Sequence, residues 1–286
     1  MKNFLKIIFT MLICGNIFSQ TKEELIKAIK TINVVDDGPN LISSSEDSSK
    51  ISDYNAENFE KLKLLLSEEE LLKFSRSRNK VLRTYAIKEL IWSENKNFNI
   101  VEAFLNELKK NQVVETASGC LVGDFDKVYS IVYHTYWNFI GEEKRKNDVT
   151  LQKLDSVIIN SKKNLYWLIY LRTFENGKLE ETLLPQIEKL AFKRNNSYAL
   201  GYLKEYYPNK YDNQIEEYFA NVFPKAKFKA DENDIYFFHL LITMLLESGN
   251  EKMKNIAIEK LKKEFIWKEQ HRSWFENVLE KSNINL

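Results

Sequence analysis

The chain has 286 residues, of which 42 are Lys or Arg and 41 are Asp or Glu, so its net charge is only +1. This balance gives no reason to expect nucleic acid or an anionic membrane as the partner, and the length suits one long domain or two ordinary ones. The chain contains only 8 Gly and 4 Pro. Because both residues are typical of turns and disfavour helices, their scarcity favours an all-α chain.

The first residues have the layout of a secretory signal peptide. Lys2 and Lys6 accompany an apolar run over residues 4–13, and small and polar residues follow from Gly15. The run is too short to span a bilayer, which takes about 20 apolar residues. We therefore expect residues 1–19 to be a signal peptide, and the mature chain to be periplasmic or secreted with no transmembrane segment.

The two cysteines, Cys14 and Cys120, bear on the same prediction. Cys14 lies inside the expected signal peptide, so the mature chain keeps one thiol and forms no internal disulfide. A lipoprotein cysteine usually follows a small residue, whereas Ile13 precedes Cys14. Lipidation at Cys14 is therefore disfavoured.

Residues 20–54 are expected to hold one helix and a flexible linker. Thr21–Ile32 has apolar residues at helical spacing. A turn is predicted at Asp36–Asn40, and Ser43–Ser49 is a polar run, so the linker is placed at about 34–54. The packed body is expected to begin near Asn55.

The body, residues 55–286, is predicted to consist of successive helices. Ser67 and Glu70 form the pattern of a capping box for a short helix that ends at Phe74, and Asn79 is expected to cap a helix that ends at Trp92. Short connections suit antiparallel neighbours. The other helices are expected near 55–66, 98–109, 124–140, 148–161, 163–174, 179–193, 196–206, 211–222, 232–248, 250–264 and 268–281.

Three of these helices share an alanine followed four positions later by a leucine. The pairs are Ala86 with Leu90, Ala199 with Leu203, and Ala257 with Leu261, and Arg83 precedes the first pair. This frame resembles the second helix of a HEAT repeat, and the stretch 63–90 resembles uncharacterised exported bacterial proteins with HEAT-like helices. The resemblance implies antiparallel helix pairs stacked as an irregular α-solenoid, with Arg83 bonded to an acid of a neighbouring turn. The alanines are 113 and 58 residues apart, whereas HEAT units run about 40 to 47, so the repeats are degenerate or interrupted.

No reactive constellation stands out in the sequence. Cys120 and His134 are 14 residues apart, about 21 Å along one helix, whereas proton transfer needs about 3 Å. His239 lies in an apolar helix and is expected to be a core residue, while His271 is expected on a solvated face. These scattered residues lack the spacing of a zinc site, so we expect no catalytic residue, no cofactor and no metal.

The acidic run Asp231–Asp234 resembles the start of a calcium-binding loop. Ile235 and Tyr236, however, stand where that loop requires a ligand and a glycine. Acidic residues also favour helix N-termini, where they oppose the positive end of the helix dipole. The run is therefore interpreted as a helix start.

Aromatic residues at helical spacing have two interpretations. They are normally core, because wide gaps between helices need large side chains. Tyrosine and tryptophan on the concave side of a helical array would instead form a surface for a peptide or a glycan. The stripe Tyr198, Tyr202 and Tyr206 is the candidate binding surface.

These observations predict an exported, non-enzymatic binding or scaffold protein whose partner is a protein or a peptide. One alternative is a hydrolase or lyase acting on glycans or peptides, whose carboxylates meet only in three dimensions, about 5 to 10 Å apart. Another is an envelope partner or toxin-neutralising protein that binds through one exposed apolar patch.

Overall fold

The computed structural model describes residues 20–37, 51–118, 121–264, 266–269 and 271–286, and most of these are helical. The predicted signal peptide, most of the expected linker and Cys120 lie outside the described residues. The chain divides after Gly141 into two compact units, called unit 1 and unit 2 below. Among the described residues, no helix is both long enough and apolar enough to cross a membrane.

Unit 1 combines helices with three short strands. In chain order its elements are α2 (Lys22–Ile32), β1 (Val34–Asp36), α3 (Asn55–Lys63), α4 (Glu68–Phe74), α5 (Lys80–Trp92), α6 (Ile100–Lys110), β2 (Val113–Ser118), β3 (Leu121–Lys127) and α7 (Val128–Ile140).

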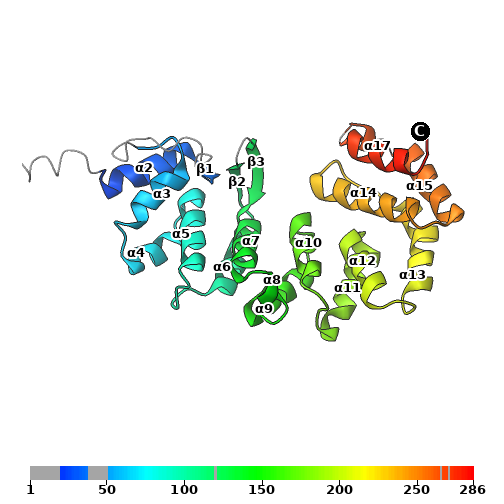
Figure 1. Ribbon diagram of the computed structural model, residues 1–286, viewed down its shortest axis with the longest axis horizontal. Helices are drawn as coiled ribbons and strands as arrows, with labels where there is room; N and C mark the ends of the chain where they lie inside the picture. The colour runs from blue at the N-terminus through cyan, green and yellow to red at the C-terminus, as the bar shows by residue number, and fades with distance from the viewer. Residues whose placement is uncertain (1–19, 38–50, 119–120, 265, 270) are drawn as a thin grey trace, which may run out of the picture. The chain divides into compact units, whose positions relative to one another are not determined.

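Unit 2 is helical over its described residues (Figure 1). Its elements are α8 (Glu142–Arg145), α9 (Val149–Ile159), α10 (Trp167–Glu175), η1 (Glu181–Leu183), α11 (Leu184–Arg194), α12 (Ser197–Tyr206), α13 (Asp212–Glu217), the π-helical turn η2 (Tyr218–Val222), η3 (Phe223–Lys225), α14 (Glu232–Leu246), α15 (Glu251–Lys263), α16 (Ile266–Glu269) and α17 (Arg272–Lys281).

The helix starts expected from capping residues are confirmed. The Ser67 hydroxyl accepts from the backbone N–H of Glu70 at 3.2 Å, and the Glu70 carboxylate accepts from the Ser67 N–H at 3.0 Å. Asn79 Oδ1 accepts from the N–H of Leu82 at 2.9 Å. Each cap satisfies donors that the first helical turn leaves without a partner.

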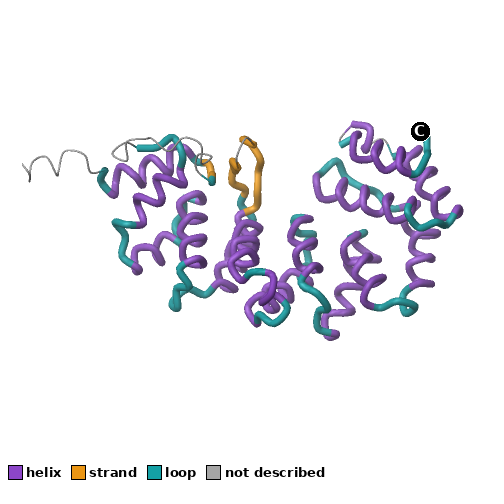
Figure 2. The backbone as a smooth tube through the Cα atoms, viewed as in Figure 1, coloured by secondary structure: helices purple, strands orange, loops and turns teal. Residues whose placement is uncertain are grey.

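The expectation of an all-α chain is wrong in unit 1, which contains a three-stranded sheet (Figure 2). β1 pairs in parallel with β2, and β2 pairs antiparallel with β3. The helix expected at 124–140 begins only at Val128, because the residues before it belong to β3. Valine and threonine in β1 and β2 suit a strand, since β-branched side chains lose χ1 freedom in a helix.

Strand β1 also corrects the expectation of a linker at residues 34–36. The Asp36 carboxylate accepts from the N–H groups of Asn55 and Ala56, at 2.7 and 3.0 Å, and so caps the start of α3. The Asn55 amide in turn donates to the Val34 carbonyl at 2.8 Å. The hydroxyl of Tyr85 on α5 bonds the backbone of Asp36. These bonds join β1 to both α3 and α5.

Among the described residues, three helices end at an asparagine C-cap in the left-handed conformation. Asn33, Asn111 and Asn195 are the C-caps of α2, α6 and α11, with φ of 57, 51 and 54°. This left-handed conformation is usual for glycine, and asparagine tolerates it better than most residues. At these three helix ends, asparagine therefore occupies the position at which glycine is usual.

All six alanines and leucines of the HEAT-like frame are buried in their own units. Ala86 and Leu90 on α5 lie in the core of unit 1. The core of unit 2 contains the other four, on α12 and α15: Ala199, Leu203, Ala257 and Leu261. These positions therefore serve packing and are not available to a ligand.

Candidate functional site

The middle residue of the predicted tyrosine stripe is part of the core. Tyr202 on α12 is 3% exposed and its ring lies 5.1 Å from that of Phe174. Its hydroxyl accepts from the backbone N–H of Leu179 at 2.7 Å. Burial raises the pKa of Tyr202 to about 12. This residue therefore holds α12 against the segment after α10 and offers little to a partner.

The other two tyrosines of the stripe are half-buried. Tyr206 packs on Tyr202 with ring centroids 4.7 Å apart, and burial raises its pKa. Tyr198, at the start of α12, contacts Tyr236 and Phe237, both at 6.3 Å between centroids. The pKa of Tyr198 is also raised, first by burial and then by the neighbouring Tyr236. Only Tyr198 therefore joins a larger group of accessible rings.

That group consists of five partly exposed rings contributed by α10 with its preceding residue, α12, α14 and α17. The Trp167 and Tyr236 rings are stacked with centroids 3.7 Å apart and 11° between their planes. Trp274, which is 36% exposed, meets Tyr236 edge-on at 5.5 Å. We call this group the aromatic surface: Tyr166, Trp167, Tyr198, Tyr236 and Trp274.

The start of α14 holds one edge of the aromatic surface through polar contacts. Glu232 Oε1 accepts from the Tyr166 hydroxyl at 3.1 Å and from Trp167 Nε1 at 3.2 Å. Asn233 Oδ1 accepts from the Trp167 backbone N–H at 2.8 Å. These bonds orient both rings while leaving their faces partly open, which is the arrangement expected of a preformed contact surface.

The acidic run at 231–234 is a helix start, as expected. Asp231 is the N-cap of α14 and accepts from the N–H of Asp234 at 3.0 Å. Burial raises the pKa of Asp234, against the effect of its bond from the Lys229 backbone. Among the described residues, no group of three or more His, Cys, Asp or Glu side chains is placed to hold a metal ion.

One histidine belongs to unit 1, and the other two, His239 and His271 of unit 2, both contact the Trp274 ring. His134 is on α7 in unit 1, and Cys120, whose pairing with His134 the sequence spacing disfavours, lies outside the described residues. His239 is half-buried on α14, with Nε2 3.3 Å from the Trp274 carbonyl oxygen, and burial lowers its pKa. His271 is exposed and stacks on the Trp274 ring at 4.1 Å, beside the aromatic surface.

Arg83 is buried within unit 1 and makes an ion pair with the next helix. Its side chain is 1% exposed, and Nε lies 2.9 Å from Oε1 of Glu107 on α6. A second nitrogen, Nη2, donates to Glu107 Oε2 at 2.9 Å and also to Gln112. The HEAT resemblance implied an acid in a neighbouring turn, whereas Glu107 lies within helix α6.

Of the aromatic surface, only Tyr198 was among the predicted site residues, and the other four members were not: Tyr166, Trp167, Tyr236 and Trp274. Tyr236 lies in a run so apolar that the whole helix is expected to be central. Beyond its first turn, however, the half-buried positions of α14 follow helical spacing, at Tyr236, His239, Leu240, Thr243 and Met244. This is the spacing of one helix face. Polar and amphipathic residues at that spacing in an otherwise apolar helix could therefore have predicted which face of α14 is accessible.

The comparisons with known proteins supply no functional precedent. No protein-family model matches the chain, and no curated protein or solved structure has significant similarity to it.

Proposed function

We propose that this chain is an exported, non-enzymatic binding protein that captures a protein or peptide on the aromatic surface of unit 2. The observation that carries the proposal is the contact of Trp167, Tyr236 and Trp274, which come from three different helices and stay partly exposed. Tryptophan and tyrosine are enriched among residues that dominate binding energy at protein interfaces. They bury a large area while losing little side-chain entropy.

The polar groups around these rings suit a polypeptide partner. The Glu232 carboxylate and the exposed His271 lie beside the aromatic surface and offer hydrogen bonds at its edge. An interface with an aromatic centre and a polar rim is the common arrangement for proteins that bind other proteins. The fixed orientation of Trp167 also reduces the entropy lost on binding.

We propose further that the helix pairs belong to an irregular HEAT-like α-solenoid. Packing of successive helices within unit 2 supports this part of the proposal: α11 packs on α12, and α14 packs on α15. Stacked pairs of this kind expose the long faces that repeat proteins use for binding. The small sheet of unit 1 stands outside this pattern.

Site-directed photo-crosslinking tests the binding surface in the full chain. A photoreactive phenylalanine analogue replaces Trp274, and a matched chain carries it at Leu105, which is 44% exposed on α6. After expression and irradiation in the producing cell, we expect a discrete covalent adduct from position 274 and none from position 105. Adding Tyr236→Ala should abolish the adduct, because Tyr236 contacts both tryptophans.

Two results would contradict the proposal. Equal labelling at both positions would show that the aromatic surface has no preference for a partner. An adduct at position 274 that persists with Tyr236→Ala would show that the rings do not act together. A single adduct identified as a toxin would support the toxin-neutralising alternative on the same surface.

The enzymatic alternative can be tested at a pocket of unit 1. A pocket of about 390 Å³ is lined by several polar side chains, including two carboxylates, Asp37 and Asp126, together with His134 and Lys88. Hydrolysis of a glycan or peptide that is lost in both Asp37→Asn and Asp126→Asn, with the fold retained, would favour this alternative. Unchanged turnover in both variants would remove the pocket from consideration.

Export is proposed from the charge and hydropathy pattern of the first residues alone. Mass spectrometry of the product made in its natural cell should find a new N-terminus near Ser19–Thr21. A product that retains Met1 would contradict export by this route.

A further inference from the structure

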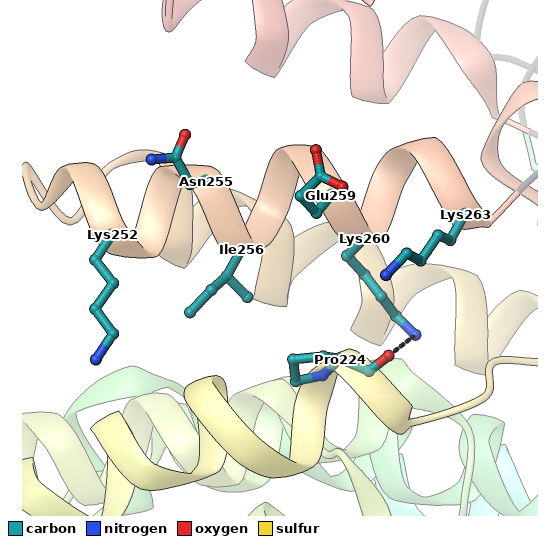
Figure 3. A pocket seen from close by; sticks show the side chains of 7 residues that line it. All are labelled: Pro224, Lys252, Asn255, Ile256, Glu259, Lys260 and Lys263. Carbon is teal, nitrogen blue, oxygen red and sulfur yellow. Dashed lines mark hydrogen bonds between the residues drawn. The ribbon is translucent and has the colours of Figure 1, made fainter.

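A groove on unit 2 lies between α15 and the η3 segment, and it does not include the aromatic surface (Figure 3). It encloses about 530 Å³, and its lining consists of Pro224, Lys252, Asn255, Ile256, Glu259, Lys260 and Lys263. Pro224 and Ile256 supply apolar surface, and three of the other five residues are lysines. The groove therefore combines an apolar floor with positive charge.

The spacing of residues along α15 explains this arrangement. Lys252, Ile256, Lys260 and Lys263 follow one another at intervals of four, four and three residues, so they share one helix face. Figure 3 shows these four side chains on the side of α15 that faces Pro224, with Asn255 and Glu259 on the opposite side. Lys252 and Lys263 stand about 16 Å apart along the helix axis, at about 1.5 Å per residue.

Lys260, the central lysine of the groove, connects its two walls through hydrogen bonds. Lys260 is 3% exposed, and its Nζ donates to the carbonyl oxygens of Pro224, at 3.4 Å, and Ala226. The same Nζ lies 2.8 Å from the Glu264 carboxylate. Its charge is thus neutralised within unit 2, and its contacts set the distance between α15 and η3.

The outer two lysines remain available. Lys252 and Lys263 are exposed, and neither lies within ion-pair distance of an acidic side chain among the described residues. The acidic residue of the lining, Glu259, is paired with Lys262 at 2.9 Å. Three more exposed lysines, Lys225, Lys227 and Lys229, follow Pro224 in the chain, although they do not line the groove themselves. This local excess of positive charge contrasts with the net charge of +1 for the whole chain.

We propose that this groove is a second binding site, which takes an extended acidic peptide segment of a partner protein with the pattern Glu-x-Leu-x-Glu. In an extended chain alternate side chains share a face, and four residues span about 13 Å. Two glutamates at that spacing reach Lys252 and Lys263 when the flexible lysine stems cover the remaining distance. The leucine between them packs on Ile256 and Pro224.

Fluorescence anisotropy tests the site with the full-length protein and the labelled peptide Glu-Ser-Leu-Ser-Glu. We expect saturable binding that weakens as salt rises from about 50 to 300 mM, because exposed charges are screened. Peptides with Gln at both ends, or with Ser in place of Leu, should each bind at least about tenfold more weakly. Lys252→Glu and Lys263→Glu should each weaken binding about tenfold, since each replaces attraction by repulsion at the rim.

Matched variants separate this site from other effects. Lys189→Glu changes an exposed lysine on α11 and should leave peptide binding unchanged. Trp274→Ala should also leave it unchanged, so this proposal and the proposed function can fail separately. Lys260→Met should lower the unfolding midpoint, as expected for its structural contacts.

Four outcomes would overturn the proposal. They are no saturable binding, equal weakening by Lys189→Glu, equal affinity for the peptides with and without leucine, and binding only to phosphatidylglycerol vesicles. The third would show a nonspecific charge effect, and the fourth would identify a membrane surface as the occupant.

Discussion

At the scale of single residues, the asparagine C-caps show how a chain with few glycines ends its helices. Asn33, Asn111 and Asn195 all adopt the left-handed conformation. Asn195 additionally bonds the Tyr218 hydroxyl at 2.9 Å, whereas the side chain of Asn33 is exposed. A substitution at Asn33 therefore measures the cost of the left-handed backbone conformation without the loss of a side-chain contact.

Replacing Asn33 by alanine should lower the free energy of unfolding by about 1 kcal/mol, because an alanine Cβ is strained at positive φ. Asn33→Gly should have a smaller effect, since glycine adopts this conformation without strain. Urea unfolding of the two variants measures the difference. Equal stability of both variants would contradict the explanation.

The half-buried imidazole of His239 predicts a dependence of stability on pH. Burial lowers its folded-state pKa, while the Trp274 carbonyl opposes the shift. The unfolded chain, with a pKa of about 6.5, then binds more protons than the folded chain at mildly acidic pH. The stability that neutral His239 contributes is therefore fully present above the unfolded-state pKa, and it is lost as the pH falls below that value.

Thermal unfolding at about pH 7.5 and pH 5 measures this effect. The fall in midpoint should be smaller in His239→Gln than in the parent chain. His271→Gln is the matched control, because His271 is exposed. In this variant the unfolding midpoint should fall by as much as it does in the parent chain. An unchanged fall in His239→Gln would assign the pH dependence to other groups.

At the scale of secondary-structure elements, α5 and α6 are joined by a buried charge pair. Arg83 and Glu107 are 1% and 2% exposed in their side chains, and Lys110 adds a second cation 2.6 Å from Glu107. Such a pair need not exceed an apolar contact in stability, but removing one partner leaves the other charge buried.

Glu107→Ala should therefore lower the free energy of unfolding by about 3 to 5 kcal/mol. Glu102→Ala, on the exposed face of the same helix, should change it by less than about 1 kcal/mol. Denaturant unfolding of both variants gives the comparison. A small effect at Glu107 would mean that Ser77 and Gln112, which also accept from Arg83, suffice to satisfy it.

At the scale of the whole molecule, the two units have separate cores. Leu90 is 1% exposed within unit 1, and Leu245 is 1% exposed within unit 2. Helix α5 packs on α4 and α7 of unit 1, and α14 packs on α12 and α15 of unit 2. A cavity at either position should therefore first affect the unit that contains it.

Leu90→Ala and Leu245→Ala should each cost about 2 to 5 kcal/mol in the unit that contains the change. Hydrogen exchange of the full chain locates that loss. We expect faster exchange in α5 and its neighbours for Leu90→Ala, and in α14 and its neighbours for Leu245→Ala. The same pattern in both variants would show that the chain unfolds as one cooperative body.

The sequence by itself determined most of the helices. Capping residues such as Ser67 and Asn79 act within one turn, and apolar spacing marks a buried face, so both signals are local. The sheet escaped prediction because it depends on pairing between distant segments: Val34 of β1 lies beside Glu115 of β2. Strand β1 has only three residues, and β2 and β3 do not alternate strictly between apolar and polar residues, so the strand pattern is absent.

Only the tertiary structure decided which aromatic and basic residues are accessible. Tyr198 and Tyr202 share a helix stripe, yet the first joins the aromatic surface and the second lies in the core. Lys252 and Lys260 share a helix face, yet one is exposed and the other buried. Helical spacing specifies direction from a helix axis, whereas accessibility depends on what packs opposite, which only the folded chain defines.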